Sequence, residues 1–199
     1  MTNELPLRCQ CGQVRGSADV SGPGMRAVCM CDDCQTFARF LDRPDVLDAH
    51  GGSDIYQMSP ARITLREGKE QLRAMRLSPK GLIRFYTACC RTPIGNTVSG
   101  KMPFIGTLHS IVDHAGDGRT RDEALGPPKH VIMGKFARGG MPKGAHAGFP
   151  LRAFPSIAGL LARNWLNDRN RPNPFFDAKT KQPVVEPRVL TKAERDALR

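Results

Sequence analysis

Short runs of apolar and β-branched residues, each closed by a turn signal, recur along the first half of the chain. Turn-forming sequences lie at residues 21–24, 59–60, 67–68 and 78–81. A spacing of roughly ten residues per strand, without helices in between, favours antiparallel, meander-like sheets over βαβ units. The strands predicted from this pattern are Gln13–Arg15, Arg26–Val28, Asp54–Met58, Arg62–Leu65, Gln71–Leu77, Leu82–Tyr86 and Phe104–Leu108. We therefore expect a mainly β fold.

Three segments carry sequence signals of a helix. Asp33–Leu41 predicts a short helix behind a cluster of cysteines. Apolar residues at 157, 160, 161 and 165 follow Ser156, a favourable N-cap, and predict an amphipathic helix over about 156–167 that packs on the body. Thr191 and Glu194 form a capping box, which predicts a short final helix.

Two segments near these helices lack a regular pattern. Met133–Pro150 holds five glycines, and we expect a loop or lid there. Arg169–Pro187 holds four prolines, and we expect an extended strap between the two C-terminal helices.

Charge divides the chain into two parts. The 199 residues carry 30 Lys+Arg against 19 Asp+Glu, for a net charge of +11. Residues 1–128 hold 16 basic and 14 acidic residues, a net +2, whereas residues 129–199 hold 14 and 5, a net +9. All seven cysteines lie in the first part. We therefore predict a thiol-bearing β domain over 1–128 and a basic, partly helical and extended arm over 129–199.

The chain has no membrane signal. No run approaches the roughly 18–20 apolar residues of a spanning helix, and the N-terminus lacks the pattern of a secretory signal. We expect a cytoplasmic protein without a membrane partner. In a reducing compartment, clustered thiols indicate metal ligands or reactive groups more often than disulfides.

The cysteines form three groups, at residues 9 and 11, at residues 29, 31 and 34, and at residues 89 and 90. Zinc binds thiolates, with four protein ligands in structural sites and three in open ones. Seven cysteines could therefore supply four ligands to one site and three ligands to another. The first and third groups are expected to close one structural zinc site that ties the first strand to a late hairpin, with Cys9, Cys11 and Cys90 as ligands and Cys89 as the candidate for the fourth.

The remaining trio, Cys29, Cys31 and Cys34, can grip a second zinc ion while one coordination position stays without a cysteine. A thiol-bearing small molecule suits such a position, because zinc lowers the pKa of a bound thiol. The alternative is a second structural site, closed by Asp32 or Asp33, by a histidine or by a neighbouring molecule. The five histidines show no ligand spacing.

These motifs resemble the glutathione-dependent formaldehyde-activating enzymes and their relatives, which include centromere protein V. The resemblance spans residues 7–112 and rests on Cys-x-Cys-Gly at 9–12, Cys-x-Cys-x-x-Cys at 29–34, an aromatic and cysteine element at 86–92 and Gly-Thr-Leu at 106–108. It implies a zinc-bearing β-tent fold with a closed site at Cys9, Cys11 and Cys90. It also implies an open site at Cys29, Cys31 and Cys34, which in the family handles a glutathione–formaldehyde adduct.

The chain departs from that family at the late cysteines. Thr87 stands where the family has the first cysteine of the pair, Arg91 stands where it has glycine, and Cys89 is an additional thiol. Cys89 either replaces the missing ligand, faces the open site or is free. The departure indicates a divergent subgroup with its own ligand.

The first functional hypothesis is a zinc-dependent carbon–sulfur lyase. It would act on a small thiol such as glutathione at the trio, with the basic loop Lys135–Lys143 attracting an anionic substrate. Asp32, Asp33 or His109 could transfer protons.

Two other hypotheses remain. A non-enzymatic nucleic-acid- or protein-binding module would use the basic arm, although its charges are dispersed and Phe175 and Phe176 are its main candidates for base stacking. A redox switch would use Cys89 and Cys90, although adjacent cysteines close only a strained ring.

Overall fold

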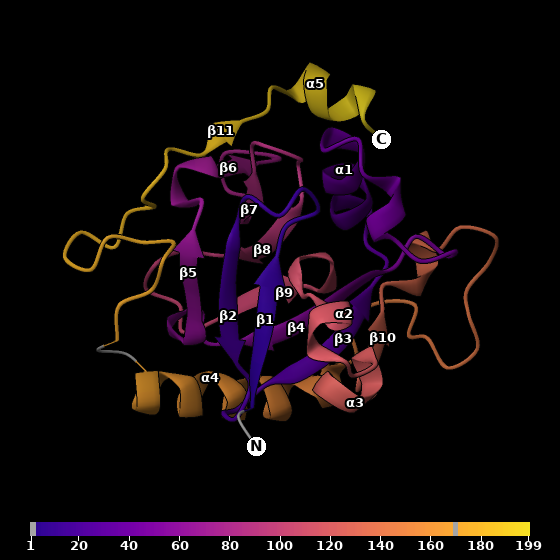
Figure 1. Cartoon of the computed structure of the whole chain (residues 1–199). Helices are drawn as coiled ribbons and strands as arrows, with labels where there is room; N and C mark the ends of the chain where they lie inside the picture. Colours follow the sequence, from indigo (N-terminus) through magenta and orange to yellow (C-terminus); the bar gives the residue numbers. More distant parts are fainter. Residues whose placement is uncertain (1–2, 169–170) are drawn as a thin grey trace.

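The computed structural model describes residues 3–168 and 171–199 (Figure 1). Its strands are β1 (Glu4–Arg8), β2 (Arg15–Asp19), β3 (Met25–Cys29), β4 (Ser53–Met58), β5 (Ile63–Glu67), β6 (Leu72–Arg76), β7 (Ile83–Thr87), β8 (Pro93–Thr97), β9 (Ile105–Leu108), β10 (His130–Ile132) and β11 (Arg188–Val189). Its helices are α1 (Asp32–Phe40), α2 (His114–Asp117), α3 (Arg121–Leu125), α4 (Phe154–Asp168) and α5 (Lys192–Ala197). The prediction of a mainly β fold is confirmed.

The strands form two sheets. One has the order β1-β2-β5 and is antiparallel, and the other has the order β10-β3-β4-β9-β8-β7-β6-β11. The inner strands of the larger sheet pair antiparallel, but β10 joins β3 and β11 joins β6 in parallel. Both edge strands come from the basic arm, which therefore completes the sheet of the body.

The main core lies between the two sheets and includes side chains from the arm. Leu7 of β1, Leu65 of β5 and Phe85 of β7 meet there. Phe175 and Phe176 pack on Phe85 with ring centroids 4.8 and 5.7 Å away. The two rings are 0% and 4% exposed, so the expectation that they offer a base-stacking surface is wrong. Their burial anchors the strap instead.

Helix α1 covers the other face of the larger sheet. Phe37 and Leu41 pack on Met75 and Leu77, and Leu190 joins them. The final helix α5 lies beside α1 (Figure 1), where the Arg39 guanidinium donates to the Leu198 carbonyl at 2.6 Å. This packing holds the first turn of α1, and the cysteines in it, against the end of β3.

Several boundaries differ from the sequence predictions. Residues 13 and 14 form a turn, so the strand predicted at Gln13–Arg15 begins only at Arg15. Strands β1 and β8 were not predicted, because Pro6, Pro93 and Gly95 interrupt the usual strand composition. Proline is nevertheless tolerated at the edges and beginnings of strands.

The three predicted helices are present, whereas the short helices α2 and α3 were not predicted. Helix α1 begins at Asp32, one residue early, and the capping box at Thr191 opens α5 as expected. Helix α4 begins at Phe154, so Ser156 is not its N-cap; Pro155 is accommodated because the first turn needs no amide donor. Its buried stripe is Leu160, Asn164 and Asp168, so the prediction that Trp165 lies on the packing face is wrong, and this residue is 48% exposed.

The strap predicted from Arg169 begins at two residues outside the described part of the chain. From Arg171 to Pro187 it is not extended as expected: the chain turns back on itself at residues 177–182, where the Asp177 amide donates to the Gln182 carbonyl and Phe176 forms a bridge with Pro183. Residues 133–150 contain a single 3-10 turn, Gly134–Phe136, in agreement with the expected loop. Across the described residues, every helix is too short or too polar to cross a bilayer.

Candidate metal centres

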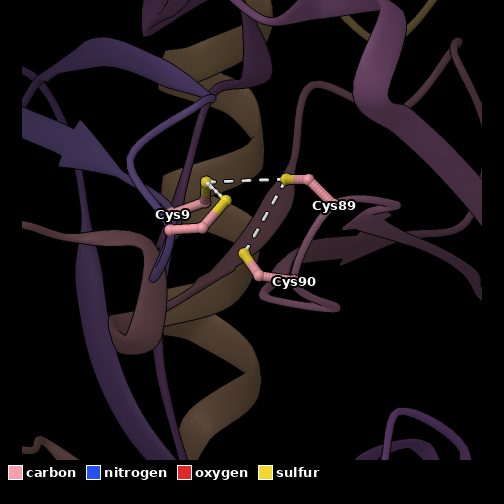
Figure 2. Close-up of side chains that lie close together, drawn as sticks. Cys9, Cys89 and Cys90 are labelled. Atoms are coloured by element: carbon pink, nitrogen blue, oxygen red, sulfur yellow. Dashed lines mark hydrogen bonds between the residues drawn. The ribbon is translucent and has the colours of Figure 1, made fainter.

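The first and third cysteine groups meet at one point, although they are far apart in sequence. Cys9 and Cys11 lie in the turn after β1, and Cys89 and Cys90 lie in the turn between β7 and β8. Their four sulfur atoms all lie within 4.8 Å of one another. Figure 2 shows Cys9, Cys89 and Cys90 with their sulfurs turned toward one another. Cys89, whose role the sequence left open, is therefore a member of this cluster.

The spacing of these sulfurs fits a tetrahedral thiolate site. Cys9 Sγ is 3.6 Å from Cys11 Sγ and 3.8 Å from Cys89 Sγ, and the Cys89 and Cys90 sulfurs are 3.8 Å apart. A zinc ion about 2.3 Å from each sulfur of a regular tetrahedron sets neighbouring sulfurs about 3.8 Å apart. The four cysteines therefore suit a closed tetrahedral metal site.

The turn at residues 9–12 is shaped by backbone hydrogen bonds. The Gly12 amide donates to the Cys9 carbonyl at 2.9 Å, with Gly12 in the left-handed region at φ 79°. The Val14 amide donates to Cys9 Sγ at 3.2 Å, which stabilises negative charge on that sulfur. Gly12 therefore allows the chain to reverse direction here, because glycine adopts positive φ without a steric penalty.

The turn that carries Cys89 and Cys90 is held by threonines and an arginine. The Thr92 amide donates to Thr87 Oγ1 at 3.0 Å, and both hydroxyls lie within 3.5 Å of Cys90 Sγ. Burial would raise the pKa of Cys90, but these hydroxyls lower it to about 5. Arg43 Nη1 donates to the Cys90 carbonyl at 3.3 Å. Thr87, at the position where a cysteine was expected, therefore supports the site from outside its ligand set.

Cys29, Cys31 and Cys34 form the second cluster. Cys29 ends β3, Cys31 is the N-cap residue of α1, and Cys34 lies in the first turn of that helix. Their sulfurs also lie within 4.8 Å of one another. Within residues 3–168 and 171–199, no histidine, carboxylate or further cysteine joins them at that spacing. The trio thus offers three ligands and leaves one position of a tetrahedral site to a group from elsewhere.

The alternative closing groups point elsewhere. Asp32 Oδ2 is 2.6 Å from Arg199 Nε, and Asp33 pairs with Arg199 at 3.7 Å and with Arg84 at 3.9 Å. Both carboxylates are thus engaged with arginines. The structure places His109 after β9, in contact with Asp54 and Arg121 on other elements.

Arg84 is a buried cation beside the trio that sequence reasoning missed. It lies on β7 with 2% of its surface exposed, and its guanidinium carbon is 5.3 Å from the centre of the Phe37 ring. Hydrogen bonds from Cys29 and Cys31 lower the pKa of Cys34 well below its usual value, and the Arg84 guanidinium lowers it further. The sequence does contain a signal for this residue, because Arg84 is the charged residue within the otherwise apolar predicted strand Leu82–Tyr86.

The basic loop borders the trio. Gln35, next to Cys34, donates to the Met30 and Phe136 carbonyls at 2.9 Å and accepts from Arg138 Nε at 2.9 Å. Arg138 is exposed there. On the side of α5, Arg199 pairs with Asp32 and Asp33. Cationic side chains from the arm therefore flank the first turn of α1 on both sides.

The chemistry of both clusters is that of metal ligands. Three or four thiols in contact cannot all ionise without a cation, because neighbouring thiolates repel one another. A divalent metal replaces their protons, and soft thiolates favour zinc among the common divalent ions. The predicted metal-ligating cysteines are thus brought together in the expected sets, and both sets could hold a metal ion.

Comparison with known proteins gives a family and no activity. Residues 1–187 match the family model described as "Family of unknown function (DUF6151)". No curated protein matches the chain.

Proposed function

We propose that this chain, which belongs to the family of unknown function DUF6151, is a zinc-dependent carbon–sulfur lyase that acts on a small thiol adduct at the trio. The observation that carries the proposal is the set of three sulfurs within 4.8 Å of one another, with no fourth ligand at that spacing in the described residues. The resemblance to the glutathione-dependent formaldehyde-activating enzymes supports the same reaction class. The four-cysteine cluster would have a structural role.

Charge around the trio favours an anionic thiol. Three thiolates with one divalent cation carry a net charge of −1, and the buried Arg84 guanidinium balances it. A substrate that arrives as a thiolate would bring one more negative charge. Arg138, which donates to Gln35 beside Cys34, and Lys135 of the same loop would attract it, as they would attract the carboxylates of glutathione.

Each group of this chain would have a defined task in the reaction. Bound zinc would supply Lewis acidity and lower the pKa of a thiol at the fourth position. Cys29, Cys31 and Cys34 would hold the metal, with Cys34 oriented by Arg84. Asp33, which faces Arg84 at 3.9 Å and is half exposed, is the candidate to exchange a proton with the hydroxymethyl oxygen of an adduct. A cytoplasmic location would keep all seven thiols reduced.

Metal analysis followed by calorimetry with glutathione tests this proposal. We expect two zinc ions per chain and binding of glutathione, but not of S-methylglutathione, which lacks the free thiol. The Cys34→Ser variant should bind one zinc ion fewer and should no longer bind glutathione. The control variant Arg73→Met, which changes an exposed arginine on β6, should still bind both zinc ions and glutathione. Fewer than two zinc ions, or equal binding of the two peptides, would contradict the proposal.

A nucleic-acid- or protein-binding module remains the second proposal, and the net +9 of residues 129–199 favours it. With Phe175 and Phe176 buried, only phosphate contacts would be left to this arm for nucleic acid. A mobility shift with single-stranded or duplex DNA that weakens as salt rises would support it. No shift at low salt would remove nucleic acid from consideration.

A further inference from the structure

A cavity of about 240 Å³ lies between the end of α4, the turn that joins β8 to β9, and the strap. Residues that line it include Lys101, Trp165, Asp168, Arg171, Asn173 and Lys181. Helix α4 lies at the opposite end of the molecule from α1 (Figure 1), so this cavity is distinct from the trio. Its lining comes in similar parts from residues 59–61 and 100–103 of the body and from the basic arm.

The walls carry cations that lack carboxylate partners. Among the described residues, no carboxylate oxygen lies within 4.0 Å of the ammonium group of Lys101 or Lys181. A second cavity of about 130 Å³ shares both lysines and adds Arg76 to its lining. Two lysines that line the same hollow give it a positive potential, which favours an anionic ligand.

A buried carboxylate gives the cavity a second kind of contact. Asp168 is 3% exposed, and its Oδ2 accepts from Arg62 Nε at 2.9 Å. Its Oδ1 accepts no hydrogen bond from the described residues, since Arg171 Nη1 pairs with it only at 3.5 Å. A buried acceptor is stabilised when a donor reaches it. Asp168 Oδ1 therefore suits a hydroxyl or amino group on the ligand.

The two lysines stand on backbone that is held rigidly. A Cβ on Gly100 would collide with the Lys181 carbonyl and the Phe176 ring, so the β8–β9 turn rests directly on the strap. Lys181 adopts the left-handed region at φ 58°, an unfavourable conformation for a residue with a side chain. The Asp177 carboxylate accepts from the amides of Lys179 and Thr180 and braces this turn. The site is thus preorganised.

We propose that this cavity binds a phosphate monoester whose organic part carries hydroxyl or amino groups, as in a sugar phosphate or a nucleoside monophosphate. Lys101 and Lys181 bind the phosphate, and Asp168 Oδ1 accepts from a hydroxyl. Trp165 also lines the cavity. The cavity would thereby bind a ligand independently of the chemistry at the trio.

Calorimetry on the zinc-loaded chain with ribose 5-phosphate, adenosine monophosphate, inorganic phosphate and ribose tests the proposal. We expect the two esters to bind more tightly than inorganic phosphate, and ribose not to bind. Lys101→Met and Lys181→Met should each weaken ester binding about tenfold, since each removes a charged hydrogen bond. Lys179→Met, on the same turn but outside the cavity lining, is the matched control and should change nothing.

Three outcomes would overturn it: affinity unaffected by both lysine changes, equal affinity for esters and inorganic phosphate, or binding of a single-stranded oligonucleotide with no binding of either ester. Asp168→Asn should retain phosphate binding and lose the preference for esters. Because Asp168 also pairs with Arg62, that variant could unfold, and the lysine variants, whose side chains carry no ion pair, decide the matter independently.

Discussion

At the scale of single residues, the two clusters differ in the groups that surround their sulfurs. The hydroxyls of Thr87 and Thr92 lie within hydrogen-bond distance of Cys90 Sγ, and neither hydroxyl carries a charge. Cys34 lies beside the full positive charge of Arg84. Buried charges are tolerated only when they are paired, so Arg84 and the trio each depend on the other.

Replacing Arg84 by methionine should weaken zinc binding at the trio about tenfold and leave the four-cysteine site unchanged. The methionine side chain fills similar space, but the compensating charge is lost. Competition with a chromophoric chelator measures both affinities in one titration. Arg73→Met, an exposed arginine on β6, is the control. Equal weakening at both sites would show that Arg84 acts through the fold alone.

His109 makes a separate prediction about pH. Burial and the nearby Arg121 cation lower the pKa of His109 to about 4. Between about pH 6.5 and pH 4 the unfolded chain therefore binds a proton that the folded chain does not, so stability falls as pH falls through this window.

His109→Gln should remove that loss. From about pH 7 to about pH 5, the free energy of unfolding should fall on the order of 1 kcal/mol less in the variant than in the parent chain. Urea unfolding at the two pH values measures it, and acid effects on the thiols cancel because both chains share them. Parallel declines would contradict the assigned pKa.

At the scale of elements, most elements with a clear local signal could be predicted from the sequence, whereas the pairing between strands could not. The capping box at Thr191, the turn at residues 9–12 and most central strands could be read from a few adjacent residues. Strands β10 and β11 are too short to show a period and exist because a neighbouring strand pairs with them. The burial of Phe175 likewise depends on Phe85, which local composition cannot reveal.

Phe175→Ala should therefore destabilise the whole chain by about 3–5 kcal/mol, the cost of emptying a core position. Phe149→Ala, a ring of the same arm that is 41% exposed, should cost less than about 1 kcal/mol. Chemical denaturation of the two variants compares them directly. A small effect of Phe175→Ala would mean that the strap is not part of the cooperative fold.

At the scale of the whole molecule, the four-cysteine cluster joins the turn after β1 to the β7–β8 turn, so it links the two sheets. Cys9 and Cys89 are 80 residues apart in sequence. The trio spans only the junction of β3 and α1. Metal binding stabilises the folded chain because the ligands come together only when the chain is folded. The gain is largest where the metal links segments that are far apart in sequence.

Cys11→Ser should accordingly lower the melting temperature strongly and remove most of its sensitivity to chelators. Cys31→Ser should lower the melting temperature much less, because the segment it closes is short. Both residues are accessible at the surface to some degree, so burial does not explain the difference. Calorimetric melting with and without a chelator measures both effects. A larger loss from Cys31→Ser would reverse the assigned structural roles.

The central claim is that one cluster is closed by four cysteines while the other keeps a coordination position for a thiol. A crystal structure of the zinc-loaded chain with glutathione, with anomalous density measured at the zinc edge, tests it most directly. We predict two metal peaks, one bound by Cys9, Cys11, Cys89 and Cys90, the other by Cys29, Cys31, Cys34 and the glutathione sulfur. A single peak, or a second metal closed by a fourth group of the protein, would contradict the account.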